Sequence, residues 1–445
     1  MPLKEWQTPI ADACEKSLNE RRFFVNACAT GSGKTFVSCE VMNRRQRPAL
    51  VVAPKAALTQ WRRVAESMGS AHRLLDVINP EQISKPSGCA WYTRDKLWRL
   101  PPGTDVYFDE IHRSCGGIKS LTGLAVAQLK AFGASLCAMS ATVACDPLHL
   151  RSVGYWAGFH GFGKGSFYSW CRANGCKDVD VGWGSGAAGR SAFMFTKNKR
   201  EASEIMARIR AGFGPSMLAL GPDDIPGFPE QTVNVKLVDL QARDRKEIDA
   251  AYADMSERMK AAGKSDMAEI MKERQRVEFV MASALAELAA GTVEDGNSAV
   301  AFFNFTEPRE RFVAELKSRH GFSDRDVAQI YGSDSAGREQ RDRQGNIDRF
   351  QRNEARIIAV NTEAGGAALS LHDETRERMR VSFIVPSYNA SSVRQALGRI
   401  RRVGGTHAVQ NFVIAAGTVM ERVKISLERK LSNLDALLDD DLEIK

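Results

Sequence analysis

A glycine-rich loop lies between an apolar run and a helical pattern near the N-terminus. Residues 23–27 are predicted to form a strand, and Gly33, Lys34 and Thr35 lead from the loop into a helix. Backbone N–H groups in such a loop surround the phosphates of a nucleotide, and the helix N-terminus adds its positive end. Lys34 is placed to reach the β- and γ-phosphates, and the Thr35 hydroxyl to bind Mg²⁺. The residues expected to line this nucleotide site are Thr30, Gly31, Ser32, Gly33, Lys34 and Thr35.

Two adjacent acids follow a second apolar run. Residues 106–108 are predicted to form a buried strand that ends at Asp109 and Glu110. Phosphoryl transfer to water needs a carboxylate that holds the metal and a group that orients or deprotonates the water. Asp109 suits the first role and Glu110 the second. An ordinary solvated turn would also explain the acids alone, but together with the glycine loop they predict hydrolysis of a nucleoside triphosphate.

Length and charge limit the kind of protein that carries these motifs. At 445 residues the chain is too long for one ordinary core, so two or three domains are expected. The net charge of +8 favours a polyanionic partner, although a basic surface kept for solubility explains it equally well. No apolar run is long enough to cross a bilayer, and the N-terminus lacks a signal-peptide pattern. We therefore expect a cytoplasmic protein without a membrane partner.

Short apolar strands alternate with helical patterns in both halves of the chain, which indicates an α/β fold with mostly parallel sheets. We expect a first lobe over residues 1–220, with a helical, glycine-rich insertion at about 150–215. Residues 221–290 are predicted to be a linker and helical segment, and residues 291–445 a second lobe that ends in a helix. The expected strands are 23–27, 50–53, 106–109 and 136–139, then 299–303, 327–331, 357–360, 383–385 and 412–414.

Further motifs follow one another in a fixed order. Gln7 lies upstream of the glycine loop, where its amide is placed to read the adenine edge, which makes ATP the expected nucleotide. The later motifs are Pro54-Lys55 with Leu58–Trp61, Ser140-Ala141-Thr142, Phe303–Thr306, Asn361–Gly366, and Gln395–Gly404. This series resembles superfamily 2 helicases, and more narrowly the Swi/Snf-type DNA translocases in their compact bacterial or bacteriophage form. The closest stretches are Thr362–Leu371, Pro386–Asn389 and Gln395–Glu421.

The resemblance implies two RecA-like lobes with an ATP cleft between them and helical insertions. It also implies roles for named residues. The catalytic set is Lys34, Asp109, Glu110, Gln395, Arg399 and Arg402. The residues that couple hydrolysis to movement are His112, Ser140, Thr142, Gly365 and Gly366. The nucleic-acid contacts are Lys55, Thr59, Thr306, Thr362 and Ser387, although each of these hydroxyls would also suit a helix cap or turn.

Arg399 and Arg402 are three residues apart, so on a helix both guanidiniums project from one face. Planar guanidinium groups suit the charge that develops on γ-phosphoryl oxygens. A basic helix face that binds the phosphate backbone is the alternative. Because these arginines belong to the other lobe, the pocket is complete only when the lobes close, and repeated closing becomes stepping along a strand.

The predicted function is ATP-dependent movement on duplex or branched DNA, such as fork remodelling, branch migration or displacement of bound proteins. The bond cleaved is the β–γ phosphoanhydride of ATP. A strand-separating DNA or RNA helicase is the first alternative. An ATP-gated nucleic-acid clamp and an ATPase subunit of a restriction or defence complex are alternatives from other classes.

Overall fold

The computed structural model describes residues 2–112, 120–141, 143–144, 146–180, 191–196, 198–261, 267–340, 342–362, 369–386 and 396–422. The chain forms two compact units that divide between Pro226 and Gly227. Each unit has its own parallel sheet and its own buried cluster of apolar side chains. Within the described residues, no helix is both long and apolar enough to cross a membrane.

The first unit contains a six-stranded parallel sheet in the order β3-β2-β4-β5-β1-β8. Its strands β1, β2 and β5 are buried along their whole length, as expected for a parallel sheet covered on both faces. The strands are β1 (Phe23–Asn26), β2 (Ala49–Val52), β3 (Leu74–Ile78), β4 (Asp105–Asp109), β5 (Ser135–Met139) and β8 (Met217–Leu218). The helices around this sheet are α1 (Thr8–Arg21), α2 (Lys34–Arg45), α3 (Leu58–Ser67), α4 (Pro80–Ser84) and α6 (Leu121–Phe132).

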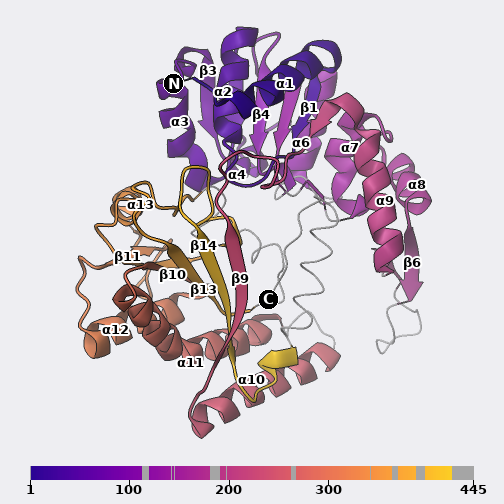
Figure 1. The fold of residues 1–445 in the computed structure, drawn as a ribbon. Helices are drawn as coiled ribbons and strands as arrows, with labels where there is room; N and C mark the ends of the chain where they lie inside the picture. The colour runs from indigo at the N-terminus through magenta and orange to yellow at the C-terminus, as the bar shows by residue number, and fades with distance from the viewer. Residues whose placement is uncertain are drawn as a thin grey trace. The chain divides into compact units, whose positions relative to one another are not determined.

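A helical region follows β5 in the chain and returns to the sheet at β8. It contains α7 (Arg151–Ala157), α8 (Lys164–Ala173), the antiparallel pair β6 (Cys176–Asp180) and β7 (Ser191–Phe195), and α9 (Lys199–Gly212). Aromatic side chains pack against one another here: Phe159 stacks on Trp170 and meets Phe213 edge-on. Figure 1 shows these elements at one side of the first unit, beside its sheet.

The second unit contains another six-stranded parallel sheet, in the order β11-β12-β10-β13-β14-β9. Its strands are β9 (Gln231–Val238), β10 (Ser298–Phe303), β11 (Val327–Ile330), β12 (Ile357–Asn361), β13 (Arg380–Ile384) and β14 (Ala408–Ala415). Its helices are α10 (Ala242–Ala261), α11 (Met267–Glu294), α12 (Thr306–His320) and α13 (Arg343–Gln351). The two parallel sheets confirm the predicted α/β fold, and each unit is a RecA-like lobe.

The segment 221–290, expected to be a linker with helices, contributes both a strand and core helices to the second unit. β9 pairs with β14 from Gln231↔Ala408 to Val238↔Ala415 and forms one edge of the sheet. Apolar residues of α10 and α11 share one buried cluster with Phe303 and Phe312. Figure 1 shows α11 and α12 lying together beside this sheet. Pro222 and Pro226 therefore precede the second unit, and the helices after them are part of its core.

Candidate active site

The glycine loop runs from β1 to the first turn of α2, as the sequence predicts. Gly31 and Gly33 have φ values of +89° and +79°, which favour glycine because a Cβ atom is strained there. A Cβ on Gly33 would also lie 2.5 Å from Gln7 Nε2. The loop is tied to the edge strand β8, since Ala27 N donates to Leu218 O at 2.8 Å. The backbone conformation of this loop therefore depends on its glycines.

Lys34 lies across the same loop. Its Nζ donates to Cys28 O at 2.8 Å and to Ala29 O at 3.1 Å. Ser32 Oγ is buried and has no hydrogen-bond partner among the described atoms, so a phosphate oxygen would satisfy it. Thr30 and Thr35 are half-buried on either side. The ammonium group, the N-terminus of α2 and this orphaned hydroxyl together fit a polyphosphate.

Gln7 contacts the loop directly. Its Nε2 donates to Ser32 O at 3.1 Å, and its Oε1 accepts from Lys4 N at 3.0 Å. The side chain is buried. It therefore joins the N-terminal segment to the phosphate loop, next to where a bound nucleotide would extend.

The far end of α2 is anchored by a buried ion pair. Arg45 Nε lies 2.6 Å from Asp105 Oδ2, and the two side chains are only 1% and 3% exposed. Asp105 is the first residue of β4 and Asp109 is the last. The pair therefore fixes α2, which begins at Lys34, against the strand that carries the acids.

Asp109 ends β4 opposite Met139 of β5 and accepts a hydrogen bond from Trp61 Nε1 at 3.0 Å. Burial and the neighbouring charge of Glu110 raise the pKa of the Asp109 carboxyl to about 6. A divalent cation beside the carboxylate would offset both effects. An oxygen donor set of Asp109 and the Thr35 hydroxyl suits Mg²⁺, which takes one or two protein oxygens and the substrate phosphates.

Glu110 has a φ of +50°, a left-handed conformation that is unfavourable for a residue with a Cβ atom. This backbone turn directs the chain from β4 into residues 111–112. His112 Nδ1 lies 3.4 Å from Glu110 Oε2 and 2.6 Å from Ser140 Oγ. A continuous polar chain therefore runs from Glu110 through His112 to Ser140, just after β5.

Trp61 contacts the predicted site, although the sequence analysis gave it no role of its own. It lies in the predicted motif Leu58–Trp61, on the buried face of α3, where its side chain is 1% exposed. Lys55 and Thr59 precede it and are exposed, as a nucleic-acid contact requires. The indole therefore connects this motif to the carboxylate of Asp109.

Two predicted nucleic-acid residues lie at the carboxyl ends of neighbouring strands in the second unit. Thr306 begins α12 after β10, and Thr362 follows β12, which pairs with β10. Thr362 Oγ1 lies 2.7 Å from Phe303 O and 3.0 Å from Asn304 Oδ1. This hydroxyl therefore ties the two strand ends together.

Arg399 and Arg402 meet at one backbone carbonyl. Arg399 Nη1 lies 3.5 Å from Leu369 O, and Arg402 Nη2 donates to the same oxygen at 2.8 Å. The helix expected beneath them is not present, because residues 398–400 form a turn. Gly398, a poor helix former, precedes Arg399. The predicted residues Gln395, Thr142, Gly365, Gly366 and Ser387 lie outside the described residues.

Glu278 is a second residue that the sequence did not single out. It lies on α11 with its side chain buried, and its Oε1 accepts from Asn304 N at 2.7 Å. Its Oε2 has no partner among the described atoms. Burial raises the pKa of this carboxyl from its ordinary 4.5 to about 8. Nothing in the local sequence of an amphipathic helix distinguishes such a residue from an exposed glutamate.

The Glu278→Gln variant tests this burial through the pH dependence of stability. A raised pKa means that the folded state binds the proton more tightly than the unfolded state does. Proton binding therefore stabilises the fold fully below pH 4.5, and this stabilisation is lost as pH rises to about 8. Glutamine stays neutral and keeps the acceptor. As pH rises between these values, the free energy of unfolding of E278Q should therefore increase relative to that of wild type. Each unit of pKa difference corresponds to about 1.4 kcal/mol, so the difference above pH 8 should reach a few kcal/mol. Unfolding midpoints against pH measure this, with E287Q, an exposed site on α11, as control; identical profiles for E278Q and wild type would contradict it.

Comparisons with known proteins show what the chain is similar to. A family model described as type III restriction enzyme, res subunit, matches residues 1–91. A protein of Acanthamoeba polyphaga mimivirus, named as an ATP-dependent RNA helicase, is 25% identical over 460 residues, covering 93% of this chain and 79% of the relative. The Sulfolobus solfataricus SWI2/SNF2 ATPase core in complex with dsDNA covers 99% of this chain and 98% of its own, at 14% identity. The TM-score of this match is 0.39.

The helicase relative matters because its similarity extends through the second unit, beyond the 91 residues of the family match. Both similarities support a superfamily 2 helicase or translocase. The loop at Lys34 and the acids Asp109 and Glu110 remain the predicted ATPase motifs. The predicted enzyme class, a nucleic-acid-dependent ATPase, is confirmed.

Proposed function

We propose that this superfamily 2 ATPase is a Swi/Snf-type translocase that moves along duplex or branched DNA. The observation that supports coupled movement most directly is the polar chain from Glu110 through His112 to Ser140. It connects the carboxylate beside the phosphates to the end of the next strand, so a change at the nucleotide has a contiguous route into the fold. The choice of duplex DNA rests on the Swi/Snf-like stretches 362–371 and 395–421.

The nucleotide site has a distinct role for each residue. Lys34 and the loop amides bind the phosphates, and Gln7 is proposed to read the adenine. Thr35 and Asp109 would hold Mg²⁺, which supplies positive charge to the phosphate oxygens. Glu110 orients the attacking water and accepts its proton. Trp61, by donating to Asp109 Oδ2, fixes the orientation of that carboxylate.

Arg399 and Arg402 are proposed to stabilise charge on the γ-phosphoryl oxygens in the transition state. In this proposal ATP binding favours closure of the two units and hydrolysis releases it. Residues on each unit would hold the phosphate backbone in turn. The proposed contacts are Lys55, Thr59, Thr306, Thr362 and Ser387.

A strand-separating RNA helicase is the second candidate, and two observations favour it. The mimivirus relative is named as an ATP-dependent RNA helicase. The motif Ser140-Ala141-Thr142 has the general superfamily 2 form and not the usual Swi/Snf form. The family match at residues 1–91 also supports a third candidate, an ATPase subunit of a restriction complex.

An ATPase titration with matched duplex DNA, branched DNA, single-stranded DNA and RNA tests the choice of track. We expect duplex and branched DNA to stimulate turnover most. Rising salt should weaken this stimulation steeply, because backbone binding releases counterions. Stimulation by single strands or RNA with none by duplex DNA would replace the translocase proposal with the helicase candidate.

A further inference from the structure

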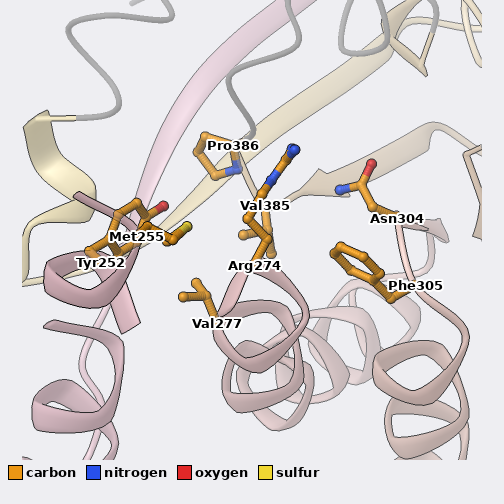
Figure 2. A pocket seen from close by; sticks show the side chains of 8 residues that line it. All are labelled: Tyr252, Met255, Arg274, Val277, Asn304, Phe305, Val385 and Pro386. Carbon is orange, nitrogen blue, oxygen red and sulfur yellow. The ribbon is translucent and has the colours of Figure 1, made fainter. Parts of the chain in front are cut away.

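A small pocket lies in the second unit where α10 and α11 approach the carboxyl ends of two strands. Asn304 and Phe305 follow β10, and Val385 and Pro386 follow β13. Tyr252 of α10 forms one wall and Arg274 of α11 lies between the two sides (Figure 2). The walls are mostly apolar, so the guanidinium and the Asn304 amide are its principal polar groups.

Arg274 differs from the other two cations of α11. Lys272 pairs with Glu269 at 2.6 Å, and Arg276 pairs with Glu247 at 3.0 Å. Arg274 has no ion pair within the described chain, and its one hydrogen-bond contact there is Nη1 to Met271 Sδ at 3.7 Å. It is nevertheless half-buried at the pocket. An unpaired guanidinium held at a pocket beside strand ends suits an anionic ligand.

Glu278, which interacts electrostatically with Arg274, does not cancel its charge at neutral pH. Glu278 lies one turn further along α11 and is buried. Because burial raises its pKa to about 8, its carboxyl is mostly protonated at pH 7. The pocket therefore keeps the positive charge of Arg274.

Asn304 is held so that its amide nitrogen can serve the same ligand. Its backbone N–H donates to Glu278 Oε1, and its Oδ1 accepts from Thr362 Oγ1 at 3.0 Å. Nδ2 makes only a long contact to Glu278, at 3.4 Å. Figure 2 shows this nitrogen on the side of the pocket that faces Arg274. The bond from Thr362 orients the amide, which leaves its donor end for the pocket.

We infer that Arg274 and Asn304 bind one phosphate of the polynucleotide backbone. This inference rests on the proposed function. It adds Arg274 of α11, outside the motifs recognised in the sequence, to Asn304, which lies in the motif Phe303–Thr306. Thr306 and Thr362 lie at the same carboxyl edge of the sheet, so a backbone that passes these hydroxyls would present its next phosphates to the pocket. The contact gives position and affinity without sequence preference.

Equilibrium binding tests this site. A fluorescent duplex and a matched single strand are titrated over a range of salt concentrations, without nucleotide. R274A should weaken binding about tenfold at low salt, the expected effect of one charge-assisted hydrogen bond. The slope of log affinity against log salt should fall by about 0.9 for duplex and about 0.7 for a single strand. R274Q, which removes the charge but keeps an unbranched polar side chain, should show the same loss. K272A, an exposed and ion-paired lysine two residues away, should bind as wild type does.

The outcomes separate this site from the proposed function. If both R274A and R274Q bind with the affinity and salt slope of the wild type, the Arg274 site is wrong and the translocase proposal is unaffected. Failure of the wild type to bind any polynucleotide would overturn both. Unfolding midpoints for each variant show whether R274A folds, and R274Q decides the question if it does not. An equal loss in K272A would show a diffuse electrostatic effect and contradict a specific contact.

Discussion

Lys34→Ala is expected to weaken ATP binding strongly and to abolish turnover, whereas Glu110→Gln is expected to keep ATP bound and abolish turnover. Lys34 Nζ lies across the phosphate loop on the carbonyls of Cys28 and Ala29, where it is placed to pair with the phosphates. Losing charge-assisted bonds to two phosphates should weaken ATP binding roughly 100-fold or more. Removal of a general base should lower turnover by about 10²–10⁴ and leave the phosphate and metal contacts in place.

Glutamine suits position 110 because it keeps the size of the side chain. The left-handed backbone at Glu110, with φ +50°, is equally strained for both residues, so the variant should fold. Binding of a fluorescent ATP analogue and phosphate release, measured on the same preparations, separate the two effects. K16A, an exposed lysine on α1, is the matched control for K34A and should behave as wild type. Equal loss of nucleotide affinity in K34A and E110Q would contradict these roles.

Arg399→Ala and Arg402→Ala are expected to lower turnover far more than they lower ATP affinity. A guanidinium that acts on transition-state charge contributes about 10³–10⁵ to the rate and little to ground-state binding. Both arginines reach Leu369 O, so each single variant leaves one guanidinium at that carbonyl. We therefore expect the double variant to lose no less than the more affected single variant.

Arg401 supplies the matched control between these two residues. Its Nε donates to Pro229 O at 2.8 Å, and its guanidinium lies over the Phe228 ring, 4.9 Å from the centroid. R401A should therefore affect stability more than turnover. Steady-state ATPase rates, nucleotide affinity and DNA affinity of the three single variants decide the matter. If R399A and R402A hydrolyse ATP normally and lose only DNA binding, the two arginines form a phosphate-binding surface.

Continuous apolar strands and glycine loops could be predicted from the sequence, because residues close together in the chain determine them. The strands β1, β2 and β10 are buried throughout, and Gly33 adopts the positive φ that its loop requires. β9 was not predicted, although Val233, Val235 and Leu237 alternate with polar residues, which is a strand signal. The prolines and glycines just before it favoured a linker, and its place in the sheet depends on pairing with β14.

Functional contacts between distant segments were not readable. Trp61 meets Asp109 across 48 residues, and Glu278 meets Asn304 across 26. Each side chain lies on the buried face of a helix, where a sequence pattern indicates burial but not the partner. For Arg399 and Arg402 the prediction of a shared helix face was wrong, because residues 398–400 form a turn. Both guanidiniums nevertheless reach the same carbonyl oxygen, Leu369 O.

If ATP hydrolysis drives movement along duplex DNA, the protein should displace a third strand from a duplex, and this displacement measures the movement itself. A triplex placed at a distance from the binding site is released only by an enzyme that travels to it. We predict ATP-dependent release by the wild type and none by E110Q, which should bind ATP and DNA without turnover. Duplex-stimulated ATPase activity without release would contradict movement and indicate an ATP-gated clamp.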